Sequence, residues 1–280
     1  MNWKELLNQG TFILKNHNIF DSEYDALQLI LTFFDDSYSN YCLKFSETVS
    51  KDDADLYFKL IAKRCENFPL QYILGKWDFY NSTFLVCEGV LIPRPETEEL
   101  VEFCVDYICK NGSAVVYDLC SGSGCIGLSI AKECPDVKCY LFELYPEAFE
   151  FSVKNKVNLK LNNADVINFD VLKVPDFSFP KADLIVSNPP YIKRSDISLL
   201  QKEVQMEPHT ALDGGCDGLD FYRAFYNNWT EQLNTYGVFA FECGEEQSNL
   251  ICKIFEDRFS SSVIKDSFGA DRFVILKKIR

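Results

Sequence analysis

The most informative part of the chain spans residues 183–191 and reads Asp183-Leu184-Ile185-Val186-Ser187-Asn188-Pro189-Pro190-Tyr191. Residues 184–186 form a continuous apolar run, which is typical of a parallel strand that is covered on both faces. The two prolines that follow lack an N–H and have a fixed φ, so they cannot extend a strand. We therefore predict a buried strand over residues 182–187 that ends in a stiff turn. Because ligands of open α/β sheets bind at the carboxyl ends of strands, we expect Asn188 and Tyr191 at the lip of a cleft.

The polar groups of this turn suit the binding of a planar –NH2 group. The side-chain carbonyl of Asn188 is an acceptor, and the backbone carbonyls around the two prolines can point outward. Together they can accept both hydrogens of an amide or an exocyclic amine, while Tyr191 packs on the attached π-system. The alternative is a surface turn that only ends a strand, because Asn, Pro and Tyr are all common in turns.

Strand-like and helix-like segments alternate on both sides of this stretch. Strands are expected over residues 114–119, 137–142, 165–169, 182–187, 237–241, 263–265 and 273–276. Helices are expected over residues 95–111, 125–132, 148–158 and 245–259. This order predicts an α/β fold with a doubly wound, mostly parallel, seven-stranded sheet.

Glycines and acids follow the first three of these strands. Gly122 and Gly124 lie between a strand and a helix, where glycine permits a tight turn and close approach of a ligand. The third glycine of a dinucleotide motif is missing, so the loop alone is weak evidence. Glu143 ends the next strand, where it can accept the hydroxyls of a ribose, and Asp170 ends the third, where it can accept from an adenine amine. The set predicts a nucleoside pocket, and the alternative is that both acids are ordinary solvated charges.

The first part of the chain has helical periodicity. Helices are expected to begin near Trp3, after Asp21 or Ser22, and after Ser50, the last running to Cys65. Residues 76–87 predict a β-hairpin with its turn at Asn81-Ser82. We expect an N-terminal helical domain over residues 1–72, a connector over 73–90 and an α/β domain over 91–280. A helical bundle of this kind can recognise a partner or give structural support, and the sequence leaves both open.

Composition excludes several classes of protein. The 280 residues carry a formal net charge of −14, which argues against a nucleic-acid-binding surface. Twelve cysteines without a CxxC pair, with only two histidines, argue against a zinc site and favour buried thiols in a reducing compartment. We see neither a signal peptide nor an apolar run near the ~18 residues of a membrane span. We therefore expect a cytoplasmic protein, without metal or membrane, and a monomer.

The motifs together resemble those of class I S-adenosylmethionine-dependent methyltransferases, and more narrowly those of the PrmC/HemK family. The stretches that carry the resemblance are residues 69–75, 91–98, 118–127, 187–191 and 207–219. The glycine loop and Asn-Pro-Pro-Tyr belong to the superfamily, while residues 71–75 and 92–98 are more specific to the family. Two positions depart from the pattern. The family usually has Asp where Glu143 stands, although the longer carboxylate still reaches a diol. Cys120 replaces Gly or Ala, and a small buried side chain is favoured there over a reactive nucleophile.

The resemblance implies a Rossmann-like fold, a helical substrate-recognition domain, and methyl transfer from S-adenosyl-L-methionine with S-adenosyl-L-homocysteine as product. The acceptor would be the amide nitrogen of the glutamine in the Gly-Gly-Gln motif of peptide-chain release factors. The implied catalytic residues are Asn188, Pro189, Pro190 and Tyr191. The implied cofactor-binding residues are Asp118, Cys120, Ser121, Gly122, Ser123, Gly124, Glu143, Asp170, Val171 and Asn188.

Two other functions stay open at this point. An adenine-N6 or other nucleobase methyltransferase would use the same turn, but it must hold a polyanion, and the net charge of −14 opposes this. A catalytically inactive methyltransferase fold could serve as a binding module, but the intact glycine loop, Glu143 and Asn188 oppose that. We expect no direct nucleic-acid substrate.

Overall fold

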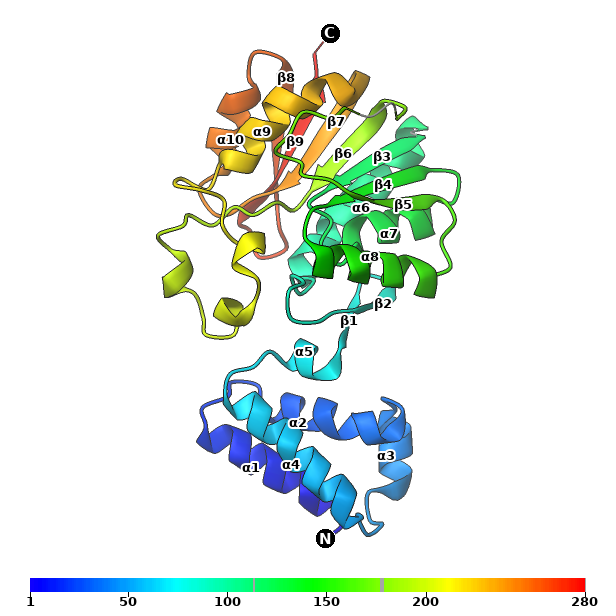
Figure 1. The fold of residues 1–280 in the computed structure, drawn as a ribbon, viewed down its shortest axis with the longest axis vertical. Helices are drawn as coiled ribbons and strands as arrows, with labels where there is room; N and C mark the ends of the chain where they lie inside the picture. The colour runs from blue at the N-terminus through cyan, green and yellow to red at the C-terminus, as the bar shows by residue number, and fades with distance from the viewer. Residues whose placement is uncertain (113, 177–178, 280) are drawn as a thin grey trace. The chain divides into compact units, whose positions relative to one another are not determined.

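The chain divides into two compact units. The computed structural model describes residues 1–112, 114–176 and 179–279. The first unit comprises Met1–Gly75 and Gln201–Met206, and the second comprises Lys76–Leu200 and Glu207–Arg280 (Figure 1). No helix in the described residues is both long and apolar enough to cross a bilayer.

The first unit is helical. Its helices are α1 (Trp3–Asn16), α2 (Ser22–Leu31), α3 (Tyr38–Lys44), α4 (Lys51–Cys65) and α5 (Leu70–Leu74). The three predicted helices are confirmed, whereas α3 and α5 were not predicted. Ser50 caps α4 as expected, because its hydroxyl accepts a hydrogen bond from the backbone N–H of Asp53 at 3.1 Å. Asp21 stands at the start of α2, but its side chain makes no capping bond.

The helices of this unit pack closely around Tyr57. A Cβ added to Gly10 of α1 would lie 2.2 Å from the Tyr57 hydroxyl, so only glycine allows this approach. The Tyr57 hydroxyl donates to the backbone oxygen of Ala26 in α2 at 3.1 Å. One tyrosine of α4 thereby fixes both neighbouring helices.

The second unit contains a seven-stranded sheet, as predicted. Its strands are β3 (Val115–Leu119), β4 (Lys138–Glu143), β5 (Ala164–Asn168), β6 (Ala182–Ser187), β7 (Leu233–Glu242), β8 (Phe259–Lys265) and β9 (Asp271–Lys278). Their order is β5-β4-β3-β6-β7-β9-β8. The first five strands in this order are parallel, and β9 runs antiparallel to both β7 and β8.

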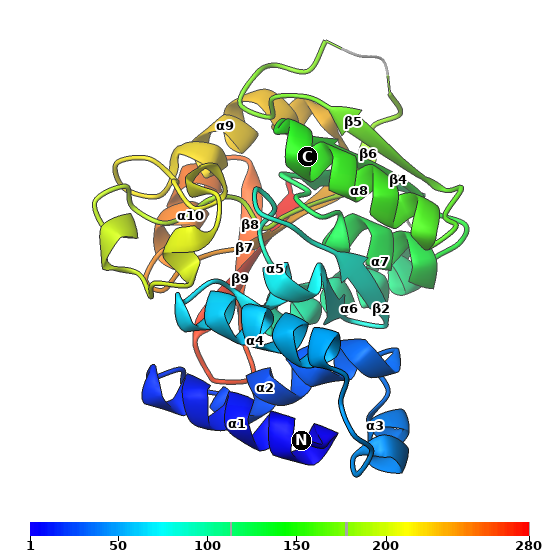
Figure 2. The same ribbon diagram turned by 60° about the horizontal axis from the view of Figure 1, so that its bottom comes forward.

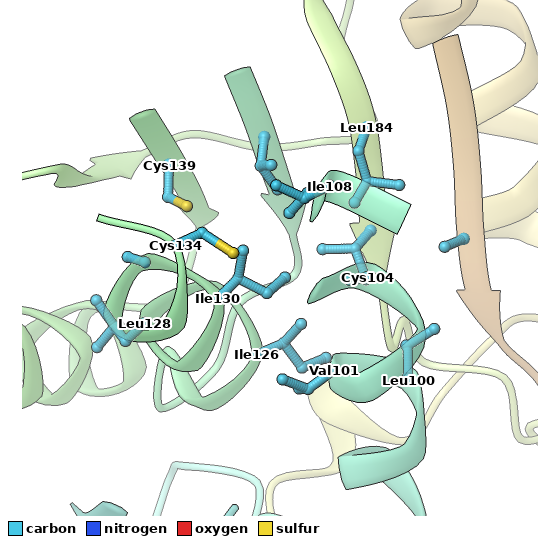
Figure 3. Packing of buried hydrophobic residues seen from close by; sticks show 14 of the residues in the cluster. Leu100, Val101, Cys104, Ile108, Ile126, Leu128, Ile130, Cys134, Cys139 and Leu184 are labelled. Carbon is cyan, nitrogen blue, oxygen red and sulfur yellow. The ribbon is translucent and has the colours of Figure 1, made fainter. Parts of the chain in front are cut away.

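Helices cover both faces of the sheet, which makes it doubly wound. On one side lie α6 (Pro95–Asn111), α7 (Cys125–Glu133) and α8 (Pro146–Asn158), and on the other lie α9 (Asp220–Trp229) and α10 (Ser248–Phe255) (Figures 1 and 2). Apolar side chains of α6 and α7, such as Val101 and Ile126, lie against each other beside the strands (Figure 3). The opposite face buries aromatic side chains, including Trp229 of α9. All twelve cysteines are free thiols, five of them buried in these layers.

Some predicted boundaries were wrong. The helix expected over residues 245–259 spans only Ser248–Phe255, because Glu246 has a positive φ of 64° and β8 already begins at Phe259. The hairpin strands are β1 (Lys76–Phe79) and β2 (Ser82–Leu85), so the turn lies at Tyr80-Asn81 rather than Asn81-Ser82. The hairpin packs on α8, since the Leu85 N–H donates to Oδ1 of Asn155 at 2.7 Å.

Candidate active site

A pocket opens at the carboxyl ends of the parallel strands of the second unit. Nine of the predicted site residues line it: Cys120, Ser121, Gly122, Ser123, Glu143, Asp170, Val171, Asn188 and Pro190. Asp118, Gly124, Pro189 and Tyr191 are not among the lining residues. The turn after β6 is tied to the end of β3, because the Ser187 hydroxyl donates to the backbone oxygen of Leu119.

The glycine loop forms one wall of the pocket. Gly122 has a φ of +56°, and a Cβ placed on it would meet no atom within 4 Å, so the loop leaves open space there. The Ser121 hydroxyl is buried, and it has no hydrogen-bond partner among the residues that the structure describes. Open space beside a buried, unpartnered hydroxyl fits a polar ligand in this wall.

Glu143 joins the glycine loop to the rest of the pocket. Its Oε2 accepts from the Gly122 N–H at 2.8 Å, and its Oε1 accepts from the Tyr145 N–H at 2.9 Å. Burial raises the pKa of this carboxyl, and the backbone N–H donors act in the opposite direction. Each oxygen keeps a second lone pair, so the side chain can still accept the two hydroxyls of a ribose.

The end of the third parallel strand supplies Asp170 and Val171. Asp170 Oδ1 accepts from the Leu172 N–H at 3.0 Å, and Oδ2 lies 3.6 Å from the Lys173 ammonium. Val171 is buried, and its backbone oxygen accepts from the Trp229 indole at 2.8 Å. The position of this acid at the pocket is therefore set by the turn that follows β5.

Asp118 and Gly124 support the loop from behind. Asp118 is fully buried, and its Oδ2 accepts from the Gly127 N–H at 2.9 Å. Burial raises the pKa of Asp118 to about 7. Gly124 faces α8, where an added Cβ would lie 2.6 Å from the Ser152 hydroxyl. These two residues shape the glycine loop without forming the wall of the pocket.

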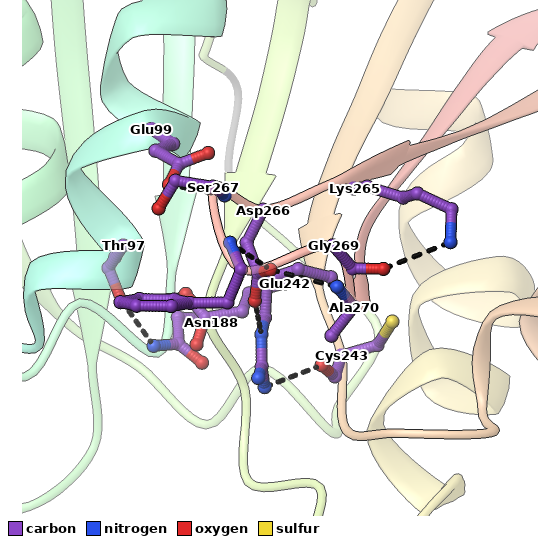
Figure 4. A network of polar contacts seen from close by, with 12 residues as sticks. Thr97, Glu99, Asn188, Glu242, Cys243, Lys265, Asp266, Ser267, Gly269 and Ala270 are labelled. Atoms are coloured by element: carbon purple, nitrogen blue, oxygen red, sulfur yellow. Dashed lines mark hydrogen bonds and ion pairs between the residues drawn. The ribbon is translucent and has the colours of Figure 1, made fainter.

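Asn188 lies at the opposite wall, and its side-chain amide has a defined partner. Its Nδ2 donates to the hydroxyl of Thr97 at 3.2 Å, and that hydroxyl donates to Oε2 of Glu242 at 2.6 Å (Figure 4). Since the amide nitrogen bonds to Thr97, the Oδ1 atom is left to accept from a ligand.

The rest of the turn is held by close backbone contacts. A Cβ on Gly218 would lie 2.3 Å from the backbone oxygen of Tyr191, and one on Gly214 would lie 2.8 Å from that of Pro190. The Tyr191 oxygen also accepts from Nε2 of Gln247 at 2.8 Å. The Tyr191 ring packs against the aromatic core of the sheet, and its pKa is raised by burial.

Comparisons with known proteins agree with this geometry. Residues 5–75 match the family described as PrmC N-terminal domain, and residues 100–213 match the methyltransferase small domain family. A release factor glutamine methyltransferase of Clostridium acetobutylicum is 39% identical over 231 residues, which cover 81% of each chain. The chain belongs to the release factor glutamine methyltransferase family. A member from Fusobacterium nucleatum is 34% identical over 98% of this chain and 78% of its own.

Solved structures extend the comparison to the fold. A methyltransferase from Pyrococcus furiosus superposes with a TM-score of 0.52 at 18% identity, over 80% of this chain and 95% of that one. The predicted class I methyltransferase fold is confirmed. Like other members of its family, the chain is an S-adenosylmethionine-dependent methyltransferase.

Several residues of this methyltransferase site were not predicted from the sequence. Thr97 and Glu242 hold Asn188, and Arg94 lines the pocket while paired with Glu207. Glu207 is buried and also accepts from the Ile92 N–H at 3.0 Å. Arg94 and Thr97 lie within the family-specific residues 92–98, so that segment was the available signal. Among the described residues, no group of three or more His, Cys, Asp or Glu side chains could hold a metal ion.

Proposed function

We propose that this chain transfers a methyl group from S-adenosyl-L-methionine to the side-chain amide nitrogen of the glutamine in the Gly-Gly-Gln motif of peptide-chain release factors. The observation that carries the proposal is the Asn188 side chain, whose oxygen is free to accept beside a pocket suited to a nucleoside. The relatives from Clostridium acetobutylicum and Fusobacterium nucleatum, both named release factor glutamine methyltransferases, support it.

The pocket residues fit S-adenosyl-L-methionine, which supplies a methyl group bonded to a positively charged sulfur. Glu143 would accept the ribose hydroxyls, and Asp170, with Val171 beside it, would bind the adenine amine. The open glycine loop and the unpartnered Ser121 hydroxyl would receive the amino-acid part of the cofactor. Cys120, Ser123 and Asn188 would complete the wall, with Asp118 and Gly124 supporting the loop.

The acceptor nitrogen needs positioning, because its lone pair is delocalised into the amide carbonyl. Asn188 Oδ1 and the backbone carbonyl of Pro189 would accept its two hydrogens, and Pro190 would keep the turn rigid. The nitrogen lone pair would then face the methyl group, and the two acceptors would stabilise the positive charge that grows on nitrogen. The N–C bond would form as the S–C bond breaks, which leaves S-adenosyl-L-homocysteine, and the nitrogen would lose one of its two protons. Tyr191, whose ring packs against the aromatic core of the sheet, would support the turn from behind.

The remaining parts of the chain take supporting roles. Residues 1–72 would recognise the release factor, residues 73–90 would connect, and residues 91–280 would carry the reaction. The partners are release factors in the cytoplasm, with no direct nucleic-acid substrate, and the enzyme acts as a monomer. The net charge of −14 supports a protein substrate over a polyanionic one.

The proposal is tested by incubating the protein with methyl-labelled S-adenosyl-L-methionine, offering a release factor and duplex DNA in parallel. We expect label on the release factor and none on the DNA. Label on DNA alone would favour the nucleobase methyltransferase. If calorimetry detects no cofactor binding and neither acceptor is labelled, the inactive binding module is the better account.

A further inference from the structure

An asparagine amide can present either its oxygen or its nitrogen to a ligand, and the two ends have opposite hydrogen-bonding character. The proposed reaction needs the oxygen of Asn188, because the acceptor –NH2 group can only donate its hydrogens to it. If the Asn188 amide were turned the other way, its NH2 group would face the NH2 group of the acceptor. Neither group could then accept a hydrogen bond from the other. Something in the protein must therefore define which end of Asn188 faces the pocket.

Two buried side chains define this orientation. Thr97 and Glu242 are each 2% exposed, so water does not compete for their hydrogen bonds. The Thr97 hydroxyl donates its single hydrogen to Oε2 of Glu242 at 2.6 Å. With that hydrogen committed, the Thr97 oxygen can only accept, and the group that donates to it is Nδ2 of Asn188 at 3.2 Å. A turned amide would bring its oxygen against an oxygen with no hydrogen to offer.

The three side chains come from separate elements. Thr97 lies in the first turn of α6, Glu242 ends β7, and Asn188 follows β6. The hydrogen-bonded pairs are 91 and 145 residues apart along the chain. Glu242 does not line the pocket, whereas Thr97 and Asn188 do. Glu242 can therefore act on the acceptor only through Thr97.

Charged and titratable groups surround this carboxylate. Arg272 on β9 and Arg94 before α6 favour its charged form, while Glu96 opposes it. Tyr191, Tyr222 and Cys243 also interact electrostatically with the Glu242 carboxylate. Burial has the largest effect and raises the pKa of Glu242, and the two guanidinium groups offset only part of it.

We propose that Thr97 and Glu242 are positioning residues that hold the Asn188 amide with its oxygen toward the acceptor nitrogen. This inference rests on the proposed function, since it assigns a requirement of the same reaction. It predicts that methyl transfer depends on the hydroxyl group of Thr97 and not on the shape of the Thr97 side chain.

The test compares Thr97→Val, which keeps the shape and loses the hydroxyl, with Thr97→Ser, which keeps the hydroxyl and loses a methyl. Transfer to a release factor is measured for both, together with cofactor affinity and the midpoint of thermal unfolding. We expect Thr97→Val to lower kcat about tenfold or more, as the loss of one orienting hydrogen bond implies. Thr97→Ser should stay within about threefold of the wild type, with unchanged cofactor affinity in both variants.

Two outcomes would overturn the inference: a Thr97→Val enzyme as fast as the wild type, or equal losses in the two variants. If Thr97→Val does not fold, Thr97→Ala replaces it in the comparison with Thr97→Ser, and the same two outcomes apply. A wild-type protein that does not label the release factor at all would instead defeat the proposed function. The two failures are therefore distinguishable.

Discussion

At the scale of single residues, the site consists of a rigid acceptor beside a nucleoside pocket. Asn188 is held from behind by Thr97, and its oxygen is free to accept. Glu143 is held by the glycine loop through the N–H of Gly122. Asn188 and Glu143 are therefore held by different groups, Asn188 by side chains of α6 and β7 and Glu143 by backbone N–H groups after β3 and β4. The turn that carries Asn188 is also tied to the end of β3 through Ser187.

Because different groups hold Asn188 and Glu143, we expect that acceptor binding and cofactor binding can be separated. Asn188→Ala should lower kcat for transfer by about a hundredfold or more, because it removes a preorganised acceptor for the charge that develops on nitrogen. The dissociation constant for S-adenosyl-L-methionine, measured by calorimetry, should change little. Asn111→Ala, at the exposed end of α6, serves as the control. Parallel losses of turnover and cofactor affinity would contradict the separation of the two walls.

The acidic side of the pH–rate profile should report Glu242. Burial raises the pKa of this carboxyl to about 7, and only the charged form, which has no hydrogen to donate, commits the Thr97 hydroxyl to donating toward Glu242. Activity should therefore rise with pH through about 7 in the wild type. Glu242→Gln cannot titrate, so its profile should be flatter in this range. An unchanged acidic limb in this variant would assign the titration elsewhere, for example to Asp118, which also titrates near 7.

The raised pKa of Glu242 also affects the stability of the folded protein. The folded state holds the Glu242 proton more tightly than the unfolded chain, whose ordinary pKa is 4.5. Wild-type stability should therefore fall relative to Glu242→Gln as pH rises from about 4.5 to about 7, and the difference should level off above that. Urea unfolding of both proteins across this range measures it.

The sequence alone could predict where Asn188 lies but not which residues hold its side chain. A turn after an apolar run is a local pattern, and the sequence therefore predicted both the strand over 182–187 and the acceptor after it. Thr97 and Glu242 are far from Asn188 in the chain, and no local pattern links them. Their pairing depends on how α6 and β7 pack, which only the structure shows.

At the scale of elements, Arg64 of α4 forms two ion pairs in the first unit. One joins α4 to α2, and the other joins α4 to a segment that is distant in the sequence. Arg64 Nε lies 2.6 Å from Oδ2 of Asp25, and its Nη2 lies 2.6 Å from Oε1 of Glu203. Arg64 and Asp25 have only 5% of their side chains exposed, whereas Glu203 has 40%. Burial raises the pKa of Asp25 even beside the guanidinium.

Arg64→Met should therefore be strongly destabilising. It leaves Asp25 buried without its cation, and breaking a buried pair in this way costs about 3–5 kcal/mol of unfolding free energy. The loss should shrink as pH falls, because Asp25 can then be neutral. Arg258→Met, in an exposed pair with Glu231, is the control and should cost less than about 1 kcal/mol. Urea unfolding at two pH values measures both. Similar costs for the two variants would show that burial does not control the strength of the Arg64 pair.

Elements with a clear apolar period were predictable, and those formed by tertiary packing were not. The strand β6 matches its predicted bounds, and α4 begins after its predicted cap. The helix α9 was not predicted, since its five aromatic residues suit strands as well as helices, and its burial against the sheet decides its form. The predicted end of α10 was wrong because a β-strand begins only a few residues after the helix.

At the scale of the whole molecule, the chain returns to its first unit after most of the second is complete. Residues 201–206 belong with the helices of the first unit, although they lie between strands of the sheet in the sequence. The sequence could not predict this, because the contact of Glu203 with Arg64 spans 139 residues. The overall class was nevertheless predictable, because alternating strands and helices with glycine and acids at strand ends admit few arrangements.

The most direct test of the account is to locate the transferred methyl group. A release factor is incubated with the protein and S-adenosyl-L-methionine, then digested and sequenced by mass spectrometry, beside a variant with Ala in place of the glutamine of Gly-Gly-Gln. We expect one methyl group on the side-chain nitrogen of that glutamine, and none on the alanine variant. A methyl group on any other residue, or equal methylation of the two substrates, would contradict it.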